Sequence, residues 1–508
     1  MRRRPPSGGD AIELAEIYTR ANQGIDAPLV SVQVHLSSGL PAFTIVGLPE
    51  TAVKESKERV RSALINSHFE FPTRRITVNL APAELPKEGG RYDLAIAIGI
   101  LAASDQIPAS TLPEYEFIGE LGLSGNLRAV GAILPAAIAC GARGKRLWVA
   151  KGNAEGAALV DGLCVLPAAH LLNISAHLYD REKVAPWQRC QDPTTLEDNS
   201  LDAVIGQQQA KRALEIAACG GHHLLFFGPP GTGKTMLASR LPAILPRLSN
   251  AEALQVAAIY SVAGKTLPSA LNARPFRAPH HSASAAALVG GGSHPRPGEI
   301  SLAHFGVLFL DELPEFSRSV LELLREPLES GEIRLSRVAA QICYPAQFQL
   351  LAAMNPCPCG YLGSRQCHCS PDQIKRYRDK ISGPLLDRID LQVNVLAIDK
   401  KQLTHPQTAP HQADSATMRR QINAARQRQL QRQNCLNSRL NEESLRRYCP
   451  LDRSQTQLMH RAIDHFNLST RGYYRVLRVA RSIADLAGDQ TPRSNHYQEA
   501  LSYRIAPS

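Results

Sequence analysis

The sequence lacks an apolar run long enough to cross a bilayer, although 44% of its residues are hydrophobic. Residues 2–4 are three arginines, as at the start of a secretory signal. Residues 5–10, however, are Pro, Ser, Gly and Asp, whereas a secretory signal continues with an apolar segment at this point. We therefore expect a cytoplasmic protein with no membrane partner. Residues 1–11 are expected to be a disordered tail, or to lie upstream of the true start.

The cysteine distribution does not indicate a disulfide framework either. Four of the eleven cysteines lie within the thirteen residues 357–369, and the others are scattered. Because the same chain carries a phosphate-binding motif at residues 228–235, this distribution favours the cytosol and a metal site over disulfides.

The length and charge of the chain limit its organisation and its partners. With 508 residues it is too long for one core, so about two to four domains are expected. The net charge of +11 suits a polyanionic partner such as nucleic acid, although many basic proteins bind none. Charge alone therefore decides little.

The most informative segment is a glycine-rich run that follows an apolar strand at residues 224–227 and precedes a helix starting near residue 236. It consists of Gly228, Pro229, Pro230, Gly231, Thr232, Gly233, Lys234 and Thr235. In this strand–loop–helix setting, backbone N–H groups close around phosphates. Lys234 is expected to reach the outer phosphates and the Thr235 hydroxyl to hold Mg²⁺. The chain is predicted to bind a nucleoside triphosphate.

Two further apolar strands end in polar residues. Residues 307–310 end in Asp311 and Glu312, where Asp311 is expected to hold the Mg²⁺ shell and Glu312 to polarise the attacking water. Residues 350–354 end in Asn355, which is expected to lie between the strands that carry Lys234 and Asp311 and to orient water or the γ-phosphate. A turn-forming Asn before a proline is the alternative for Asn355.

The arginine Arg388 lies between two aspartates. It is either part of a surface salt bridge or an arginine finger that reaches the ATP of a neighbouring subunit.

Two Cys-x-Cys pairs are predicted to form a structural zinc site, namely Cys357, Cys359, Cys367 and Cys369. Reduced thiols without a metal are the alternative, and His368 is a possible substitute ligand. Residues 333–338 and 341–344 indicate a β-hairpin. Arg334 and Arg337 on it are predicted to contact DNA phosphates, or else to be ordinary solvated charges.

Composition and periodicity predict five segments. These are the tail at 1–11, an α+β domain at 12–180, a polar linker at 181–200, a nucleotide domain at 201–400 that includes the cysteine-rich loop 357–369, and a helical region at 401–508. Within the first domain, strands are expected at 30–34 and 76–80, an amphipathic helix at 51–67 and a buried helix at 93–103. Residues 418–432 and 452–487 indicate helices.

Three stretches carry a family resemblance: residues 47–56, residues 277–281 with 298–304, and residues 469–475. They resemble the AAA+ ATPases, and most closely the magnesium-chelatase-like ComM (YifB) family, over about residues 12 to 506. The resemblance implies an α/β P-loop AAA+ module with a helical lid, ATP and Mg²⁺ as cofactors, and a hexameric ring. It also implies that Arg388 is the finger, with Arg325 as a competitor, and that Arg471 is a second sensor that contacts the γ-phosphate from the lid.

The N-terminal block resembles the proteolytic domain of Lon through residues 86–90 and 119–128. The nucleophilic serine of Lon would fall near Arg91 or Tyr92, and its lysine near Leu134, so neither catalytic residue is present. Without them no acyl-enzyme forms, and we expect a catalytically inactive fold used for assembly or DNA contact.

As a whole, the resemblance implies an ATP-dependent DNA motor. The expected activity is that of a branch-migration helicase on single-stranded or branched DNA, which helps incoming strands to integrate during natural transformation and homologous recombination. A chelatase-type remodelling subunit that acts on a protein partner is the alternative. An ATP-dependent protease is excluded by the missing Ser–Lys pair, and a transcription activator by the absent helix-turn-helix.

Overall fold

The structure is a computed structural model that describes residues 14–47, 51–189, 200–267, 270–292, 295–336, 341–397 and 414–504. The chain divides into two compact units. Unit 1 comprises residues 1–193 and 257–267, and unit 2 comprises residues 194–256 and 268–508. Among the described helices, none combines the length and the apolar character that crossing a membrane requires.

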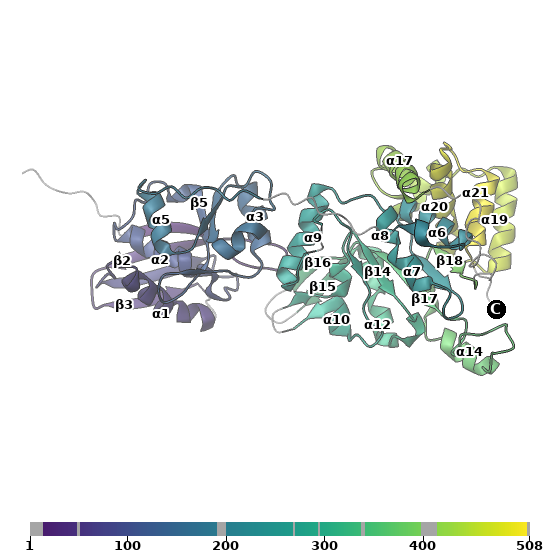
Figure 1. The fold of residues 1–508 in the computed structure, drawn as a ribbon, viewed down its shortest axis with the longest axis horizontal. Helices are drawn as coiled ribbons and strands as arrows, with labels where there is room; N and C mark the ends of the chain where they lie inside the picture. Colours follow the sequence, from purple (N-terminus) through teal and green to yellow (C-terminus); the bar gives the residue numbers. More distant parts are fainter. Residues whose placement is uncertain are drawn as a thin grey trace, which may run out of the picture. The chain divides into compact units, whose positions relative to one another are not determined.

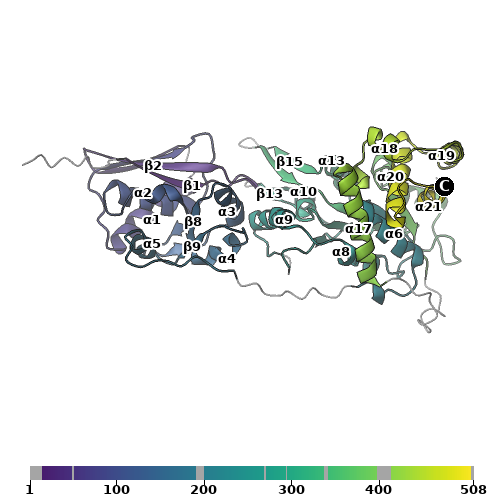
Figure 2. The same cartoon turned by 90° about the horizontal axis from the view of Figure 1, so that it is seen from above.

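Unit 1 contains a seven-stranded mixed sheet in the order β3-β4-β2-β1-β5-β8-β9 (Figures 1 and 2). Its strands are β1 (Leu14–Arg20), β2 (Leu29–Ser37), β3 (Ala42–Val46), β4 (Arg75–Ala81), β5 (Tyr115–Ile118), β8 (Arg146–Ala150) and β9 (Val165–Ala168), with a small pair β6 (Glu120–Leu121) and β7 (Leu127–Arg128). Its helices are α1 (Thr51–Asn66), α2 (Asp93–Ala103), α3 (Ile133–Ala142), α4 (Ala154–Ala157) and α5 (Leu171–Leu178).

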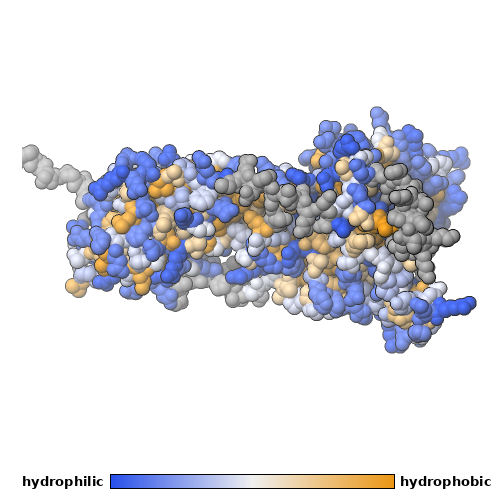
Figure 3. All heavy atoms as spheres, in the orientation of Figure 1, coloured by the Kyte–Doolittle hydropathy of each residue, from blue (hydrophilic) through white to orange (hydrophobic). Residues whose placement is uncertain are grey.

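Helix α2 forms the centre of the unit 1 core. All eleven of its residues are buried, which is why its sequence is apolar all round rather than amphipathic. It packs on β1 and β2 so closely that a Cβ at Gly99 would lie 2.5 Å from Val34 Cγ2. On the face shown in Figure 3, the hydrophobic residues of this unit form small groups among hydrophilic ones.

Unit 2 contains a five-stranded sheet in the order β11-β14-β17-β10-β18, with every neighbouring pair parallel. Its strands are β10 (Leu224–Phe227), β11 (Phe276–Arg277), β14 (Val307–Leu310), β17 (Gln349–Met354) and β18 (Leu391–Asn394). Two hairpins, β12 (Gly290–Gly291) with β13 (Arg296–Pro297) and β15 (Glu332–Ser336) with β16 (Gln341–Pro345), lie outside this sheet.

Between residues 208 and 502 the described helices are mostly short. They are α6 (Gln208–Gly220), α7 (Lys234–Ser239), α8 (Leu241–Ile244), α9 (Asn250–Ala263), α10 (Ala285–Val289), α11 (Glu299–Leu302), α12 (Arg318–Leu323), α13 (Arg325–Ser330), α14 (Pro371–Arg378), α15 (Gly383–Leu386), α17 (Ser415–Gln433), α18 (Glu442–Tyr448), α19 (Arg453–Phe466), α20 (Thr470–Ala487) and α21 (Ser494–Ser502).

Both faces of the parallel sheet are buried. Alternate residues of each strand point to opposite sides, so Phe226 and Phe309 lie in one core cluster with α6 and the C-terminal helices. Leu225 and Leu308 lie in the other cluster, with α12 and α15. Burial on both faces explains why these strands are continuous apolar runs. Helix α20 contacts α6, α17 and α21, and this packing attaches the C-terminal helices to the sheet (Figure 1).

The structure confirms the predicted strands and helices that fall within its described residues. The strands at 30–34 and 76–80 lie in β2 and β4, the helix at 51–67 is α1, and the buried helix at 93–103 is α2. The mostly parallel α/β sheet that the phosphate-loop motif indicates is present.

Candidate nucleotide-binding site and cysteine cluster

The phosphate loop, residues 228–235, leaves the sheet at the end of β10. Gly231 and Gly233 have positive φ angles of 77° and 84°, a conformation that glycine adopts most easily. Gly228 is needed for another reason. A Cβ at this position would lie 2.2 Å from the carbonyl oxygen of Val395, so only glycine leaves room for the backbone of the segment after β18.

Lys234 is folded back onto the loop. Its Nζ donates to the carbonyl oxygens of Gly228 and Pro229, both at 2.8 Å, and to Asn355 Oδ1 at 3.1 Å. The side chain is buried, and burial lowers the pKa of Lys234 while Asp311 acts in the opposite direction. The ammonium is thus held where phosphate oxygens can replace the loop carbonyls as its partners.

Thr235 and Asp311 come together across the sheet. The Thr235 hydroxyl donates to Asp311 Oδ2 at 2.6 Å, while Asp311 Oδ1 accepts from the backbone N–H of Glu312 at 2.9 Å. One hydroxyl and one carboxylate are oxygen ligands of the kind that Mg²⁺ takes beside phosphates. These two residues therefore fit a Mg²⁺ ion.

Glu312 has a partner that the sequence did not indicate. Its backbone is in the left-handed region, with φ 51°, and its carboxylate lies 3.4 Å from His281 Nδ1. His281 packs edge-on against Phe316 and lies beside His280, whose Nδ1 is 2.8 Å from Ser282 Oγ. In the sequence, both histidines stand out only as part of the stretch 277–281 that carries the family resemblance. Only the parallel pairing of β11 with β14 places the residues after β11 near Glu312.

The strand order explains why these residues meet. The loop 228–235, the acids at 311–312 and Asn355 each follow the carboxyl end of a parallel strand, namely β10, β14 and β17. Because β17 lies between β14 and β10, Asn355 is placed between the strands that lead to Asp311 and Lys234, as predicted. The carboxyl edge of such a sheet is the usual position of a ligand site.

Arg388 lies at the amino edge of the same sheet, where the parallel strands begin. It precedes β18, whose first residue Leu391 is in register with Leu224, the first residue of the parallel strand β10. Its guanidinium is buried and donates to Glu329 Oε1 at 2.5 Å and to the carbonyl oxygen of Pro384 at 2.6 Å. Burial lowers the pKa of Arg388, which Glu329 counteracts.

Arg471 lies with Arg388 and not with Lys234. Its guanidinium is 3.9 Å from the same Glu329 carboxylate. Ser469, which caps α20, is hydrogen-bonded to Asp387 at 3.2 Å and so ties this end of the helix to the amino edge of the sheet. Arg388 and Arg471, the finger and second-sensor candidates, therefore lie together. They lie at the amino edge of the sheet, whereas the phosphate loop of the same chain lies at the carboxyl edge.

Two hollows flank this arginine pair. One, of about 390 Å³, is lined by Arg325, Arg388 and Glu329, with Arg325 paired to Glu322 at 2.6 Å. The other, of about 730 Å³, is lined on one side by Arg471 and Glu329. Arg325, the competing finger candidate, is thus a neighbour of Arg388 rather than of Lys234.

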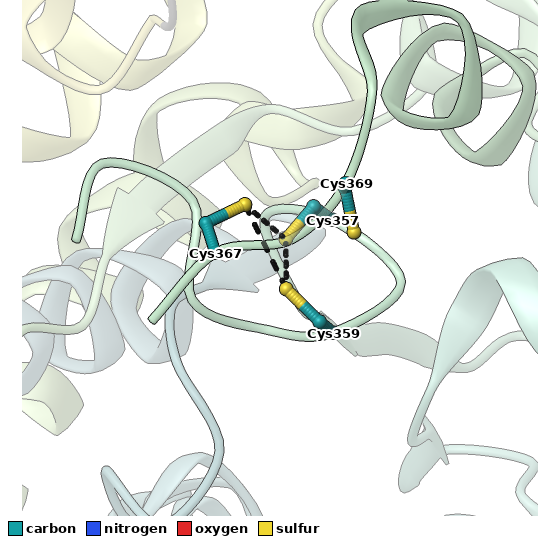
Figure 4. A group of neighbouring side chains, drawn as sticks. All are labelled: Cys357, Cys359, Cys367 and Cys369. Atoms are coloured by element: carbon teal, nitrogen blue, oxygen red, sulfur yellow. Dashed lines mark hydrogen bonds between the residues drawn. The ribbon is translucent and has the colours of Figure 1, made fainter. Parts of the chain in front are cut away.

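The four cysteines of residues 357–369 converge (Figure 4). Sγ–Sγ distances are 3.3 Å for Cys357 to Cys359, 3.9 Å for Cys357 to Cys367 and 3.7 Å for Cys359 to Cys367, and all four sulfurs lie within 4.8 Å of one another. A tetrahedral zinc site with Zn–S bonds of about 2.3 Å places its sulfurs about 3.8 Å apart. The thiol set, completed by Cys369, therefore fits zinc. Backbone N–H groups in the loop lower the pKa of Cys359 to about 6, which favours its thiolate.

The predicted hairpin is present as β15 and β16. Arg334 on it is exposed and lies 3.5 Å from Glu332, while Arg337 falls outside the described residues. This geometry is that of a solvated pair and does not by itself indicate a ligand.

Comparisons with known proteins cover nearly the whole chain. Residues 200–403 match the family model described as magnesium chelatase, subunit ChlI. Residues 32–153 match the model described as subunit ChlI of Mg-chelatase, and residues 412–504 match the model of the ChlI C-terminal part. Protein YifB of Escherichia coli is 49% identical over 97% of both chains. Competence protein ComM of Haemophilus influenzae is 50% identical over 97% of this chain and 98% of its own.

The chain belongs to the ComM (YifB) family of magnesium-chelatase-like proteins. A more distant relative, the magnesium-chelatase 38 kDa subunit of Cereibacter sphaeroides, is 28% identical over 31% of this chain and 52% of its own. Membership of this AAA+ type implies the use of ATP and Mg²⁺, in agreement with the phosphate loop and the Thr235–Asp311 pair.

In this ComM-family chain, the three residues expected at the positions of the Lon catalytic residues lie in the interior of unit 1. Arg91, Tyr92 and Leu134 are all buried. The Nζ of the nearby Lys87 donates to the carbonyl oxygen of Pro82, and the side chain is buried. None of these three residues is an exposed nucleophile.

Proposed function

We propose that this protein is an ATP-hydrolysing DNA motor whose sites are shared between neighbouring chains of a ring, most simply a hexamer. The single observation behind this is the separation of the two halves of the site. The phosphate loop, Asp311 and Asn355 lie at the carboxyl edge of the sheet, whereas Arg388 and Arg471 lie at its amino edge.

The distance between the two edges of the sheet favours a site that is shared between two chains. A four-residue strand such as β10 spans about 13 Å, and the arginines are folded back onto Glu329 at its far end. In a closed ring, head-to-tail contacts bring the amino edge of one chain to the carboxyl edge of the next. Arg388 then stabilises transition-state charge on a neighbour's ATP, and Arg471 joins it there from the helical lid.

The remaining roles follow from the contacts at the carboxyl edge. Lys234 exchanges its loop carbonyls for the outer phosphates, and Asn355 orients the γ-phosphate or the attacking water. Glu312 accepts a proton from that water as general base. Thr235 and Asp311 hold Mg²⁺, which neutralises charge on the phosphates when bound.

Assembly can be tested by dilution. We expect the hydrolysis rate per chain to fall as the purified protein is diluted below its assembly concentration, with Lys234→Ala as the inactive control. A rate per chain that stays constant over the whole range, while size measurements show only monomers, would refute the shared site.

DNA is the proposed substrate of the motor. Support comes from the net charge of +11 and the name of the relative, competence protein ComM. In that role the protein moves branch points so that incoming single strands integrate during transformation and recombination. We expect ATP-dependent movement of a synthetic three- or four-way junction by the wild type and none by Lys234→Ala.

The DNA contact has its own test. Replacing Arg334 and Arg337 with Ala is expected to weaken DNA binding and to reduce its salt dependence, because two phosphate contacts are lost. Hydrolysis without DNA should be unchanged.

A remodelling subunit that acts on a protein partner is the second candidate, and the matches to magnesium-chelatase subunits favour it. DNA distinguishes the two. Junction DNA should stimulate hydrolysis by a DNA motor and should have no effect on a protein remodeller.

A structural zinc ion in the four-cysteine cluster completes the proposal. Its four thiolates leave no open coordination position, so the ion would serve architecture rather than chemistry.

A further inference from the structure

The cysteine cluster lies in an unusual connection. Residues 355–370, between β17 and α14, contain no helix or strand. A connection of this length has little core of its own, and its internal backbone hydrogen bonds are few, such as Gly360 N–H to the carbonyl oxygen of Cys357 at 2.9 Å. Such a segment usually needs a covalent or metal link to hold one conformation.

This connection touches the phosphate loop directly. Gly360 has a φ angle of 84°, and a Cβ there would lie 2.6 Å from Pro230 Cδ and 3.1 Å from its Cγ. The backbone at Gly360 is therefore seated on the ring of Pro230, in the middle of the loop that is to surround the phosphates. Gly363, three residues further on, has a similar φ angle of 86° but no atom within 4 Å of the same position.

The start of the connection and the helix that follows it also reach the site. Cys357 is buried and follows Asn355 by two residues, and Asn355 Oδ1 accepts from Lys234 Nζ at 3.1 Å. Helix α14 follows the connection, and its last residue, Arg378, lies over the ring of Phe227, 5.7 Å from its centroid. Phe227 is the last residue before the phosphate loop. Three contacts thus link the cysteine connection and the helix α14 after it to the strands and the loop of the candidate site.

We propose that the four-cysteine connection is a zinc-dependent brace of the phosphate loop, which sets the affinity of the protein for ATP. A zinc ion held by Cys357, Cys359, Cys367 and Cys369 fixes the connection in the conformation that seats Gly360 on Pro230. The inference rests on the proposed function in one respect, because it takes residues 228–235 as the ATP site.

The size of the effect follows from population arithmetic. When a binding-competent conformation is only partly populated, the apparent dissociation constant rises in inverse proportion to that population. If the loop without zinc keeps its braced form one tenth of the time, nucleotide affinity falls about tenfold. Zinc suits the four sulfurs because soft thiolate ligands in tetrahedral geometry select it.

A glycine pair provides the matched test, in the full-length protein. Gly360→Ala and Gly363→Ala both place alanine in a left-handed conformation, so the backbone strain is about equal in the two variants. Only Gly360→Ala pushes against Pro230. We expect it to weaken binding of a fluorescent ADP analogue about tenfold, with zinc content by mass spectrometry equal to that of wild type. Gly363→Ala should bind like wild type, and equal affinities for the two variants would overturn the brace.

A metal arm completes the test. Cys367→Ser with Cys369→Ser removes two thiols near the C-terminal end of the connection, seven and nine residues after Gly360 in the sequence. This double variant is expected to lose its zinc and to bind the ADP analogue about tenfold more weakly. Wild type purified from zinc-supplemented cells without a stoichiometric metal, or loss of zinc with unchanged affinity, would overturn the proposal. If the wild type and Lys234→Ala both fail to bind nucleotide, the proposed function itself is wrong, which is a different outcome.

Discussion

Mixing two inactive variants tests whether each ATP site is completed by a neighbouring chain. Arg388→Ala removes the guanidinium at the amino edge and leaves Lys234 and Glu312 intact. Glu312→Gln removes the proposed general base and leaves Arg388 intact. Each variant alone should be nearly inactive, because an arginine finger contributes about 10³- to 10⁵-fold to the rate.

Arg388→Ala should not unfold the protein. Its side chain is buried, but the partners that it leaves are a glutamate that is 53% exposed and one backbone carbonyl. Water can replace the arginine at Glu329, so we expect a stability cost of about 1 kcal/mol. Thermal unfolding of the variant should confirm that an inactive ring is still a folded one.

The rescue has a calculable size. In a ring assembled at random, a site is active when its owner is the Arg388→Ala chain and the neighbour that donates the arginine is the Glu312→Gln chain. If these fractions are p and 1 − p, the active share is p(1 − p), which peaks at about one quarter of wild type in an equal mixture. Cooperation between sites lowers this value but leaves the peak.

The assay is phosphate release from mixtures at constant total protein, after unfolding or dilution has allowed the chains to exchange. Lys234→Ala mixed with Glu312→Gln is the matched control. Both changes lie at the carboxyl edge of their own chain, so no combination completes a site. A flat rate across all ratios of Arg388→Ala and Glu312→Gln, in rings shown to contain both chains, would refute the shared site. Rescue with Arg325→Ala in place of Arg388→Ala would move the finger to Arg325.

Two further predictions concern histidines that the sequence left without a role. His281→Ala should raise hydrolysis in the absence of DNA by up to about fivefold, because the partly exposed His281–Glu312 pair, which holds the Glu312 carboxylate, is worth about 1 kcal/mol or less. The rate is measured as phosphate release, and His280→Ala is the matched control. An unchanged or lower rate in His281→Ala would contradict the view that His281 restrains Glu312. Burial lowers the pKa of His223 to about 4 and that of His304 to about 3, from an ordinary value of 6.5. The unfolded chain therefore binds protons below about pH 6.5 that the folded chain excludes, and the free energy of unfolding should fall by up to about 1.4 kcal/mol per pH unit for each histidine as the pH drops from 6.5 towards 4. Urea unfolding at about pH 7 and about pH 5 measures this slope, which His223→Gln should reduce; an equal slope in the variant would argue against His223.

The sequence by itself determined the phosphate loop, the apolar strands and the two acids after residue 310. These features are local. A glycine at a positive φ angle, a lysine at a fixed offset and a run of buried residues are each specified by neighbours in the chain. The placement of Asn355 was also predictable, because parallel strands bring their carboxyl ends to one edge.

The tertiary structure alone decided which distant side chains meet. It joined Arg471 to Arg388 through Glu329, and no local pattern links positions so far apart along the chain. It also brought His281 to Glu312 through a strand of only two residues, too short to be recognised in the sequence. The seating of Gly360 on Pro230 likewise depends on how a connection without regular structure folds. Such contacts are set by packing between elements, which periodicity and turn chemistry do not encode.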